Sequence, residues 1–244
     1  MFRQTVHSLL TAGWRGPVVV LDNSSGHETS ADDSLLRSGV EVLRTTGSLN
    51  FAQLQNVAAS IAVERGLEYF FCAHPGVLVL GPDANTSFAA AAERCVERWD
   101  ASQPDWGLIF FGSDRLMAVR VKAAADVHWD VFVPQYRADC DFYQSLKVSG
   151  WGLLHCDAGR IVSAWQKLEV PYGNHTAAAA VLDEHARAGV ADGYAISAAR
   201  AAARSPEAKV AWAMQMRTSI EYYQYKWRMD ECDMPDGHLP WQAE

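Results

Sequence analysis

The chain has 244 residues, which is enough to bury a substantial hydrophobic core. Its 29 acidic residues outnumber 21 basic ones, and the net charge of −8, without any run of Lys and Arg, argues against a nucleic-acid partner. No apolar run approaches the ~20 residues that cross a bilayer, and residues 1–10 do not resemble a secretion signal. We therefore expect a cytoplasmic protein without an integral membrane segment.

The cysteines are odd in number and widely scattered. No pair has the two-residue spacing that is typical of a structural zinc site. We predict a reduced intracellular protein. The five cysteines are Cys72, Cys95, Cys140, Cys156 and Cys232.

The first hundred residues alternate between strand and helix patterns. Short apolar runs predict strands, and apolar residues at helical spacing predict helices. This alternation is typical of an α/β layer with a mainly parallel central sheet. In chain order we expect a short helix near Leu9–Trp14, strands at 17–22 and 40–44, a helix at 49–66, strands at 68–73 and 77–80, and a helix at 86–99.

The remainder of the chain is richer in helix. We expect strands at 106–111 and 115–121, a helix after Arg137, a strand at 152–156 and then helices to about Trp227. Because there is no internal repeat and no clear linker, we predict a single domain over residues 1–228 with a helical C-terminal extension. The acidic segment 229–244 contains Pro and Gly, so we expect it to be irregular.

Polar residues follow two of the predicted strands. Asp22 ends the strand at 17–22, and the turn His74-Pro75-Gly76 follows the strand at 68–73. In open α/β sheets, ligands bind outside the carboxyl ends of the strands. These residues are therefore candidates for a binding site.

Two carboxylates, Asp139 and Asp141, stand one residue apart at the start of a predicted helix. Either acid is a good helix N-cap, and acids suit the positive end of the helix dipole. A carboxylate held beside a pocket can instead take a proton from a reacting hydroxyl. Two neighbouring carboxylates also tend to push one pKa upward, which suits a base working near neutral pH.

Four segments carry motifs in a recognisable order. They are VVVLDNSSGHET at 18–29, LNFAQLQN at 49–56, residues 115–151 with Trp129-Asp130, Asp139-Cys140-Asp141 and Gly150-Trp151, and YYQYKW at 222–227. Together, over roughly residues 5–228, they resemble the inverting, family-2-type glycosyltransferases. The resemblance implies a GT-A fold, in which a Rossmann-like nucleotide half and an acceptor half share one sheet. It also implies transfer of a sugar from a UDP- or GDP-linked donor to an acceptor hydroxyl.

The resemblance assigns roles to several residues. Asp139 matches the general base, and Asp141 then caps the helix; the alternative is that Asp141 is the base and Asp139 the cap. Asp22 matches a residue that hydrogen-bonds the donor's base, with Asn23 beside it, unless Asp22 only caps a loop. Asn56 either contacts the nucleotide or holds a neighbouring loop.

The family's metal site is altered in this chain. Where the resemblance implies an Asp-x-Asp motif that holds Mn²⁺ or Mg²⁺ against the donor diphosphate, the chain has His74-Pro75-Gly76, with Gly76 at the position of the metal-binding Asp. His74 is a candidate for binding a phosphate or the metal, and His155, next to Asp157, is a second candidate ligand. Each histidine is alternatively structural.

Two further features bear on function. The family's first strand has no counterpart before residue 5, so the chain matches the family from the following helix onward. The alternative to an active transferase is a catalytically silent binding or scaffolding relative, and a third possibility is another nucleotide-using α/β enzyme. We expect Tyr222, Tyr223, Lys226 and Trp227 to pack and to provide a helix-end cation.

Overall fold

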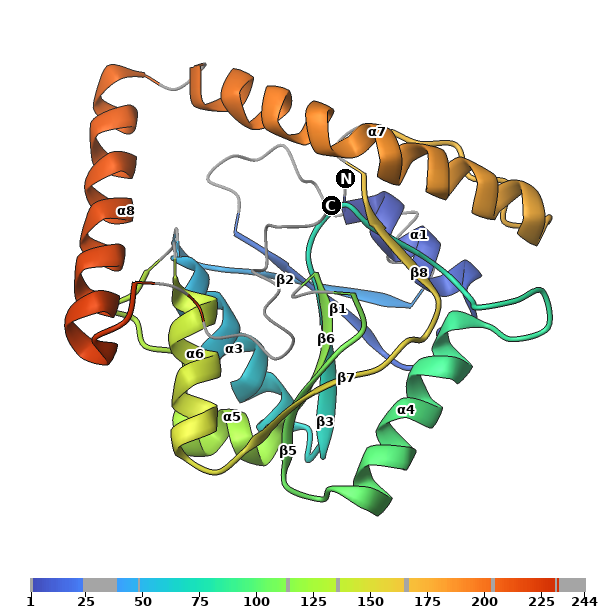
Figure 1. Cartoon of the computed structure of the whole chain (residues 1–244), viewed down its shortest axis with the longest axis horizontal. Helices are drawn as coiled ribbons and strands as arrows, with labels where there is room; N and C mark the ends of the chain where they lie inside the picture. The colour runs from blue at the N-terminus through green and yellow to red at the C-terminus, as the bar shows by residue number, and fades with distance from the viewer. Residues whose placement is uncertain are drawn as a thin grey trace.

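The computed structural model describes residues 2–23, 39–47, 49–112, 115–134, 137–164, 167–202, 205–230 and 232. Helices and strands alternate along most of the chain, and the longest helices are at its C-terminal end (Figure 1). The helices are α1 (Phe2–Thr11), α3 (Phe51–Glu64), α4 (Phe88–Ser102), α5 (Val121–Val127), α6 (Ala138–Val148), α7 (His175–Ala202) and α8 (Pro206–Trp227). The strands are β1 (Val18–Asp22), β2 (Val40–Arg44), β3 (Tyr69–Ala73), β4 (Val77–Leu80), β5 (Trp106–Phe110), β6 (Leu116–Arg120), β7 (Gly152–His155) and β8 (Arg160–Ser163).

The central sheet has four strands in the order β3-β6-β5-β7. Strand β6 is antiparallel to both β3 and β5, whereas β5 and β7 are parallel. The fold is therefore α/β as predicted, but this sheet is mixed and not mainly parallel. The physical reason is the short connection between β5 and β6, because parallel neighbours need a crossover of a dozen or more residues.

Two further strand pairs flank the central sheet. Strands β1 and β2 are parallel, and β4 and β8 are antiparallel. Strand β8 (Arg160–Ser163) was not predicted, because only two of its four residues, Ile161 and Val162, are apolar.

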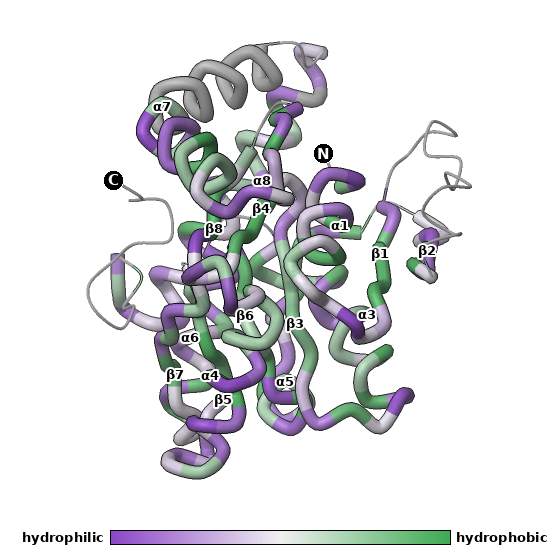
Figure 2. Tube along the Cα trace, turned by 90° about the vertical axis from the view of Figure 1, so that its right-hand side faces the viewer, coloured by the Kyte–Doolittle hydropathy of each residue, from purple (hydrophilic) through white to green (hydrophobic). Residues whose placement is uncertain are grey.

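The central sheet is covered by helices on both faces. Along β6, Met117 and Val119 belong to the hydrophobic cluster that contains residues of α3, α5 and α6. Leu116 and Ala118 belong to the cluster on the other face, with α4. This alternation follows from the two-residue period of side chains in a strand. Figure 2 shows hydrophobic residues along the strands and mixed colours along the helices that cover them.

Local sequence signals account for several helix ends. Asn50 caps α3 in a capping box, in which the Gln53 N–H donates to Asn50 Oδ1 and the Asn50 N–H donates to Gln53 Oε1. Gly66, expected as the C-terminal cap of this helix, has a φ of 64°. Ser87 accepts a hydrogen bond from the Ala90 N–H at the start of α4.

The two C-terminal helices pack in different ways. The start of α7 covers the β4–β8 pair, with Ala178 and Leu182 buried against Leu78 and Val162. Figure 1 shows α7 leading to α8, which runs down the outside of the molecule towards α6. The Ala-rich residues from His175 to Ala202 form one continuous helix, α7. In the described part of the chain, no helix is long and apolar enough to cross a bilayer.

The prediction that all five cysteines are reduced is wrong. Cys95 at α4 is joined to Cys156, just after β7, and Cys140 in α6 is joined to Cys232, after α8. Cys72 belongs to neither disulfide. The spacings of 61 and 92 residues show no local pattern, so only the fold reveals these pairs. Because disulfides are typical of oxidising compartments, the cysteines give no support to the cytoplasmic prediction.

Candidate functional site

The strand directions gather several polar residues at one edge of the central sheet. Strands β3, β5 and β7 run in the same direction, so their carboxyl ends lie at the same edge, where β6 begins. His74 follows β3, Arg115 precedes β6, and His155 ends β7 opposite Phe110 of β5. This is the edge at which α/β sheets bind ligands.

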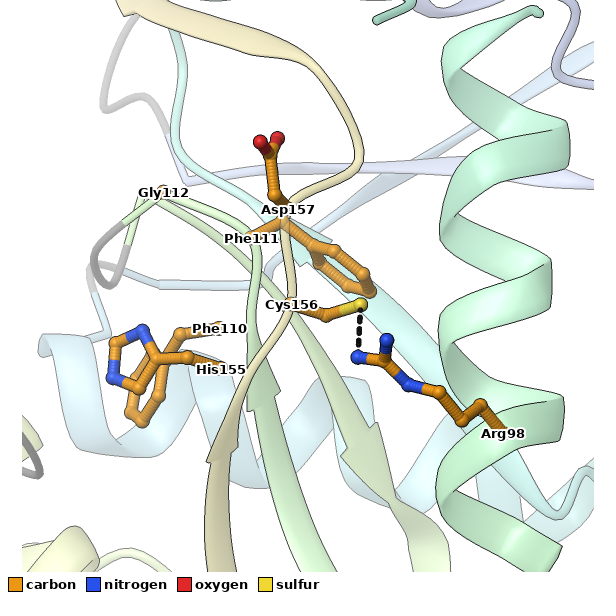
Figure 3. Close-up of a pocket in the computed structure, with 7 residues that line it drawn as sticks. All are labelled: Arg98, Phe110, Phe111, Gly112, His155, Cys156 and Asp157. Carbon is orange, nitrogen blue, oxygen red and sulfur yellow. Dashed lines mark hydrogen bonds between the residues drawn. The ribbon is translucent and has the colours of Figure 1, made fainter.

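A hollow of about 360 Å³ opens at this edge beside the ends of β5 and β7. Figure 3 shows the ring of His155 stacked on Phe110 on one side of β7 and Arg98 of α4 on the other side. The two ring centroids are 5.1 Å apart. The Arg98 guanidinium donates to Cys156 Sγ at 3.0 Å. The hollow is lined by Arg98, Phe110, Phe111, Gly112, His155, Cys156 and Asp157.

The His74-Pro75-Gly76 segment forms a tight turn between β3 and β4. The Val77 N–H donates to the His74 carbonyl at 3.2 Å, and Gly76 has a φ of 93°. Proline at the second position and glycine with positive φ at the third are typical of a type II turn. The Gly76 N–H donates to Thr5 Oγ1, and the Gly76 carbonyl accepts from the N–H of residue 164, both at 2.8 Å. Both backbone groups of Gly76 are therefore engaged in the fold.

The imidazole of His74 is acted on by two groups of opposite charge, Asp139 and Arg115. Its backbone N–H donates to the Arg115 carbonyl at 2.9 Å, and its ring meets the edge of Phe51 at a centroid distance of 6.0 Å. Burial lowers the pKa of His74, the Arg115 charge lowers it further, and Asp139 acts in the opposite direction. The Nε2 atom is buried and has no hydrogen-bond partner among the described residues. His74 is therefore held as a neutral ring with one polar atom unsatisfied.

The two acids of α6 lie in different environments. Asp141 is only 1% exposed, and its Oδ1 accepts a 2.6 Å hydrogen bond from Trp227 Nε1. The Lys226 ammonium lies 2.9 Å from the same oxygen. Burial is the largest influence and raises the pKa of Asp141 above its ordinary value, and the hydrogen bonds from Lys226 and Trp227 offset this only in part. Asp141 is therefore a buried, paired carboxylate that joins α6 to the end of α8.

Asp139 is half-buried and faces a different direction, since residues two apart on a helix point to nearly opposite sides. Its Oδ1 accepts a 2.8 Å hydrogen bond from the N–H of Cys140. Its charge acts on the His74 ring at the sheet edge. Of the two acids, Asp139 is thus the one associated with this edge.

Asp22 and Asn23 lie at the end of β1. The Asp22 carboxylate is 3.6 Å from Arg44 Nε on β2. Asn23 Nδ2 donates to the Leu49 carbonyl, and Asn23 Oδ1 accepts from the Leu49 N–H, both at 2.8 Å. Thr45 Oγ1 also donates to Asn23 Oδ1 at 2.9 Å. The Asn23 amide therefore holds the loop that leads into α3.

The Asn56 side-chain amide, like that of Asn23, pairs with the backbone of another segment. Its Nδ2 donates to the Trp129 carbonyl, and its Oδ1 accepts from the Trp129 N–H, both at 2.9 Å. This arrangement corresponds to the alternative in which Asn56 holds a neighbouring loop. A contact between Asn56 and a nucleotide stays a prediction.

The two candidate metal ligands belong to opposite edge strands of the central sheet. His74 and His155 follow the two outer strands of the four-stranded sheet, and three strand spacings amount to roughly 14 Å. Binding of one cation by both His74 and His155 stays a prediction. Among the residues that the structure describes, no group of three or more His, Cys, Asp and Glu is placed to hold a metal.

The sequence reasoning missed Arg115 and Arg98. Arg115 begins a predicted strand directly after a turn, and this position was a usable signal for a residue at the sheet edge. Arg98 carries no such signal, because its place beside the hollow depends on how α4 packs against β7.

No protein-family model matches the chain, and no curated protein matches it.

Proposed function

We propose that the chain transfers a sugar from a UDP- or GDP-linked donor to an acceptor hydroxyl with inversion at the anomeric carbon. The observation that carries the proposal is the division of roles in α6. Asp141 is neutralised by Lys226 and closed off from solvent, while Asp139 is associated with the sheet edge beside His74. A half-buried carboxylate at this edge fits the general base that the sequence resemblance implies.

In the proposed mechanism Asp139 accepts the proton of the acceptor hydroxyl as that oxygen attacks the anomeric carbon. The bond between the anomeric carbon and the diphosphate oxygen breaks at the same time, and the electron pair leaves with the nucleoside diphosphate. We assign to Asp22 the contact with the base of the donor. Asn23 and Asn56 support the site by holding the loops before α3 and after α5.

A second candidate is a nucleotide-binding protein that performs no transfer. The turn at Gly76 favours it, because a left-handed glycine stands where the resemblance implies a metal-binding acid. The two candidates make different predictions for turnover and the same prediction for nucleotide binding.

The test is incubation of the purified chain with a panel of UDP- and GDP-sugars and simple hydroxyl acceptors. Release of UDP or GDP and the mass of the glycosylated acceptor are measured. We expect Asp139→Asn to lower transfer by about 10²- to 10⁴-fold while nucleotide binding is retained. The matched control is Asp126→Asn, which changes an exposed acid of α5. Normal turnover by Asp139→Asn would remove Asp139 from the mechanism, and nucleotide binding without turnover by the wild type would favour the second candidate.

A further inference from the structure

The position of Gly76 is unsuited to a metal-binding carboxylate. With a φ of 93°, this residue adopts a conformation that strains any side chain other than glycine's. Its N–H donates a hydrogen bond to Thr5 Oγ1, and its carbonyl accepts one from the backbone N–H of residue 164. The turn is therefore built around glycine, and it offers no acid to a cation at this point.

Arg115 provides positive charge at the same edge. It directly precedes β6, which lies between β3 and β5, so it is next to the turn that carries His74. Its guanidinium has no ion-pair partner among the residues that the structure describes. Five other arginines of the described part do form ion pairs with acids: Arg44, Arg65, Arg120, Arg160 and Arg217.

His74 adds a polar group beside this charge. Its Nε2 atom is buried without a hydrogen-bond partner among the described residues. A buried polar atom of this kind calls for an explanation such as a catalytic role or a bound molecule. The backbone N–H of His74 donates to the Arg115 carbonyl at 2.9 Å, so the two residues are direct neighbours at the sheet edge.

We propose that Arg115 and His74 bind the donor diphosphate directly, so that the chain recognises a nucleoside diphosphate without a divalent cation. This inference rests on the proposed function. A guanidinium binds phosphate oxygens in a bidentate manner, and its charge is permanent. It also stabilises the negative charge that develops on the leaving diphosphate, as a metal ion does in other enzymes. The neutral imidazole of His74 donates a hydrogen bond to a phosphate oxygen.

The test is calorimetric titration of the full chain with UDP and with GDP, once in EDTA and once with Mn²⁺. We expect the same Kd within about twofold in both conditions. Arg115→Met is expected to weaken binding by about 10- to 100-fold, because it removes a charged hydrogen-bond donor. The matched control is Arg94→Met, which changes an exposed arginine of α4 and leaves the Kd unchanged. Arg115→Lys keeps the charge and is expected to lie between Arg115→Met and the wild type, and thermal unfolding verifies that each variant folds.

The outcomes separate this inference from the proposed function. Binding that requires Mn²⁺, or a Kd that Arg115→Met leaves unchanged, would overturn the inference and leave the transferase proposal standing. Failure of both nucleotides to bind in either condition would overturn both proposals.

Discussion

The indole Nε1 of Trp227 donates a 2.6 Å hydrogen bond to Oδ1 of Asp141, and this contact joins the end of α8 to the first turn of α6. The neighbouring Lys226 ammonium contacts both Asp141 and Asp130, the latter at 2.8 Å. Asp139 lies two residues before Asp141 on the same helix. The C-terminal helix is therefore a support for the candidate base.

Lys226→Met is expected to destabilise the fold by about 3 kcal/mol, because it leaves the buried carboxylate of Asp141 without a counter-charge. This value is the lower end of the usual loss of stability when one partner of a buried ion pair is removed. The Lys226 side chain is 29% exposed, so water can reach the site. Burial on its own lowers the pKa of Lys226, but hydrogen bonds to Asp130 and Asp141 outweigh it and raise the pKa above 10.5. Urea unfolding at pH 7 measures the change.

Two further variants sharpen this prediction. Lys226→Arg keeps the charge and is expected to recover most of the lost stability. Lys167→Met, which breaks a solvent-exposed pair with Glu169, is expected to cost less than about 1 kcal/mol. Equal effects of Lys226→Met and Lys167→Met would contradict a buried ion pair at Asp141.

Acidification is expected to destabilise the protein in part through His74. The folded state lowers the pKa of this ring, so below pH 6.5 the unfolded chain takes up a proton that the folded chain does not. The contribution of His74 to the free energy of unfolding is complete above pH 6.5. It is lost as the pH falls through the folded-state pKa of His74. Urea midpoints of His74→Gln at pH 7.5 and pH 5 should therefore differ less than those of the wild type. The control His7→Gln changes an exposed ring of α1, and its urea midpoints at pH 7.5 and pH 5 should differ as much as those of the wild type.

The disulfide between Cys140 and Cys232 ties the start of α6 to the segment after α8. Replacing both cysteines by serine is expected to cost about 2–5 kcal/mol, because the bond closes a long loop and restricts the unfolded chain. Thermal unfolding measures the loss. Alkylation of the unfolded wild type gives an independent check. One cysteine, Cys72, should react before reduction and all five after it, so reaction of all five without reduction would contradict both disulfides.

Much of the secondary structure was predictable, because it depends on local patterns. The strand ending at Asp22 and the end of α8 at Trp227 agree with the sequence-based prediction. The mainly parallel sheet was a wrong prediction, although the short connection between Phe110 and Leu116 already requires β6 to be antiparallel to β5. Both disulfides depend on contacts between residues far apart in sequence, and no local pattern encodes them.

The candidate site was predictable only in part. The acids of α6 were found from their spacing, but their separation into a buried partner of Lys226 and an edge residue depends on the packing of α8. Asn23 and Asn56 were chosen for a nucleotide, and the structure pairs both amides with backbone groups. Asn is a good loop-binding side chain because one amide both donates and accepts, and the sequence cannot distinguish this use from ligand binding.

The turn at Gly76 leads to a prediction that also bears on the metal site. Gly76→Ala and Gly76→Asp are each expected to destabilise the fold by about 1–3 kcal/mol, since both force a side chain into the left-handed region. Gly47→Ala, at an open loop position where an added methyl group meets nothing within 4 Å, is the matched control and should cost less than about 0.5 kcal/mol. Because the strain arises from the turn itself, Gly76→Asp should also fail to create a Mn²⁺ site in a calorimetric titration. A stable Gly76→Asp variant that binds Mn²⁺ would show that the turn accepts an acid and would contradict the argument from backbone strain.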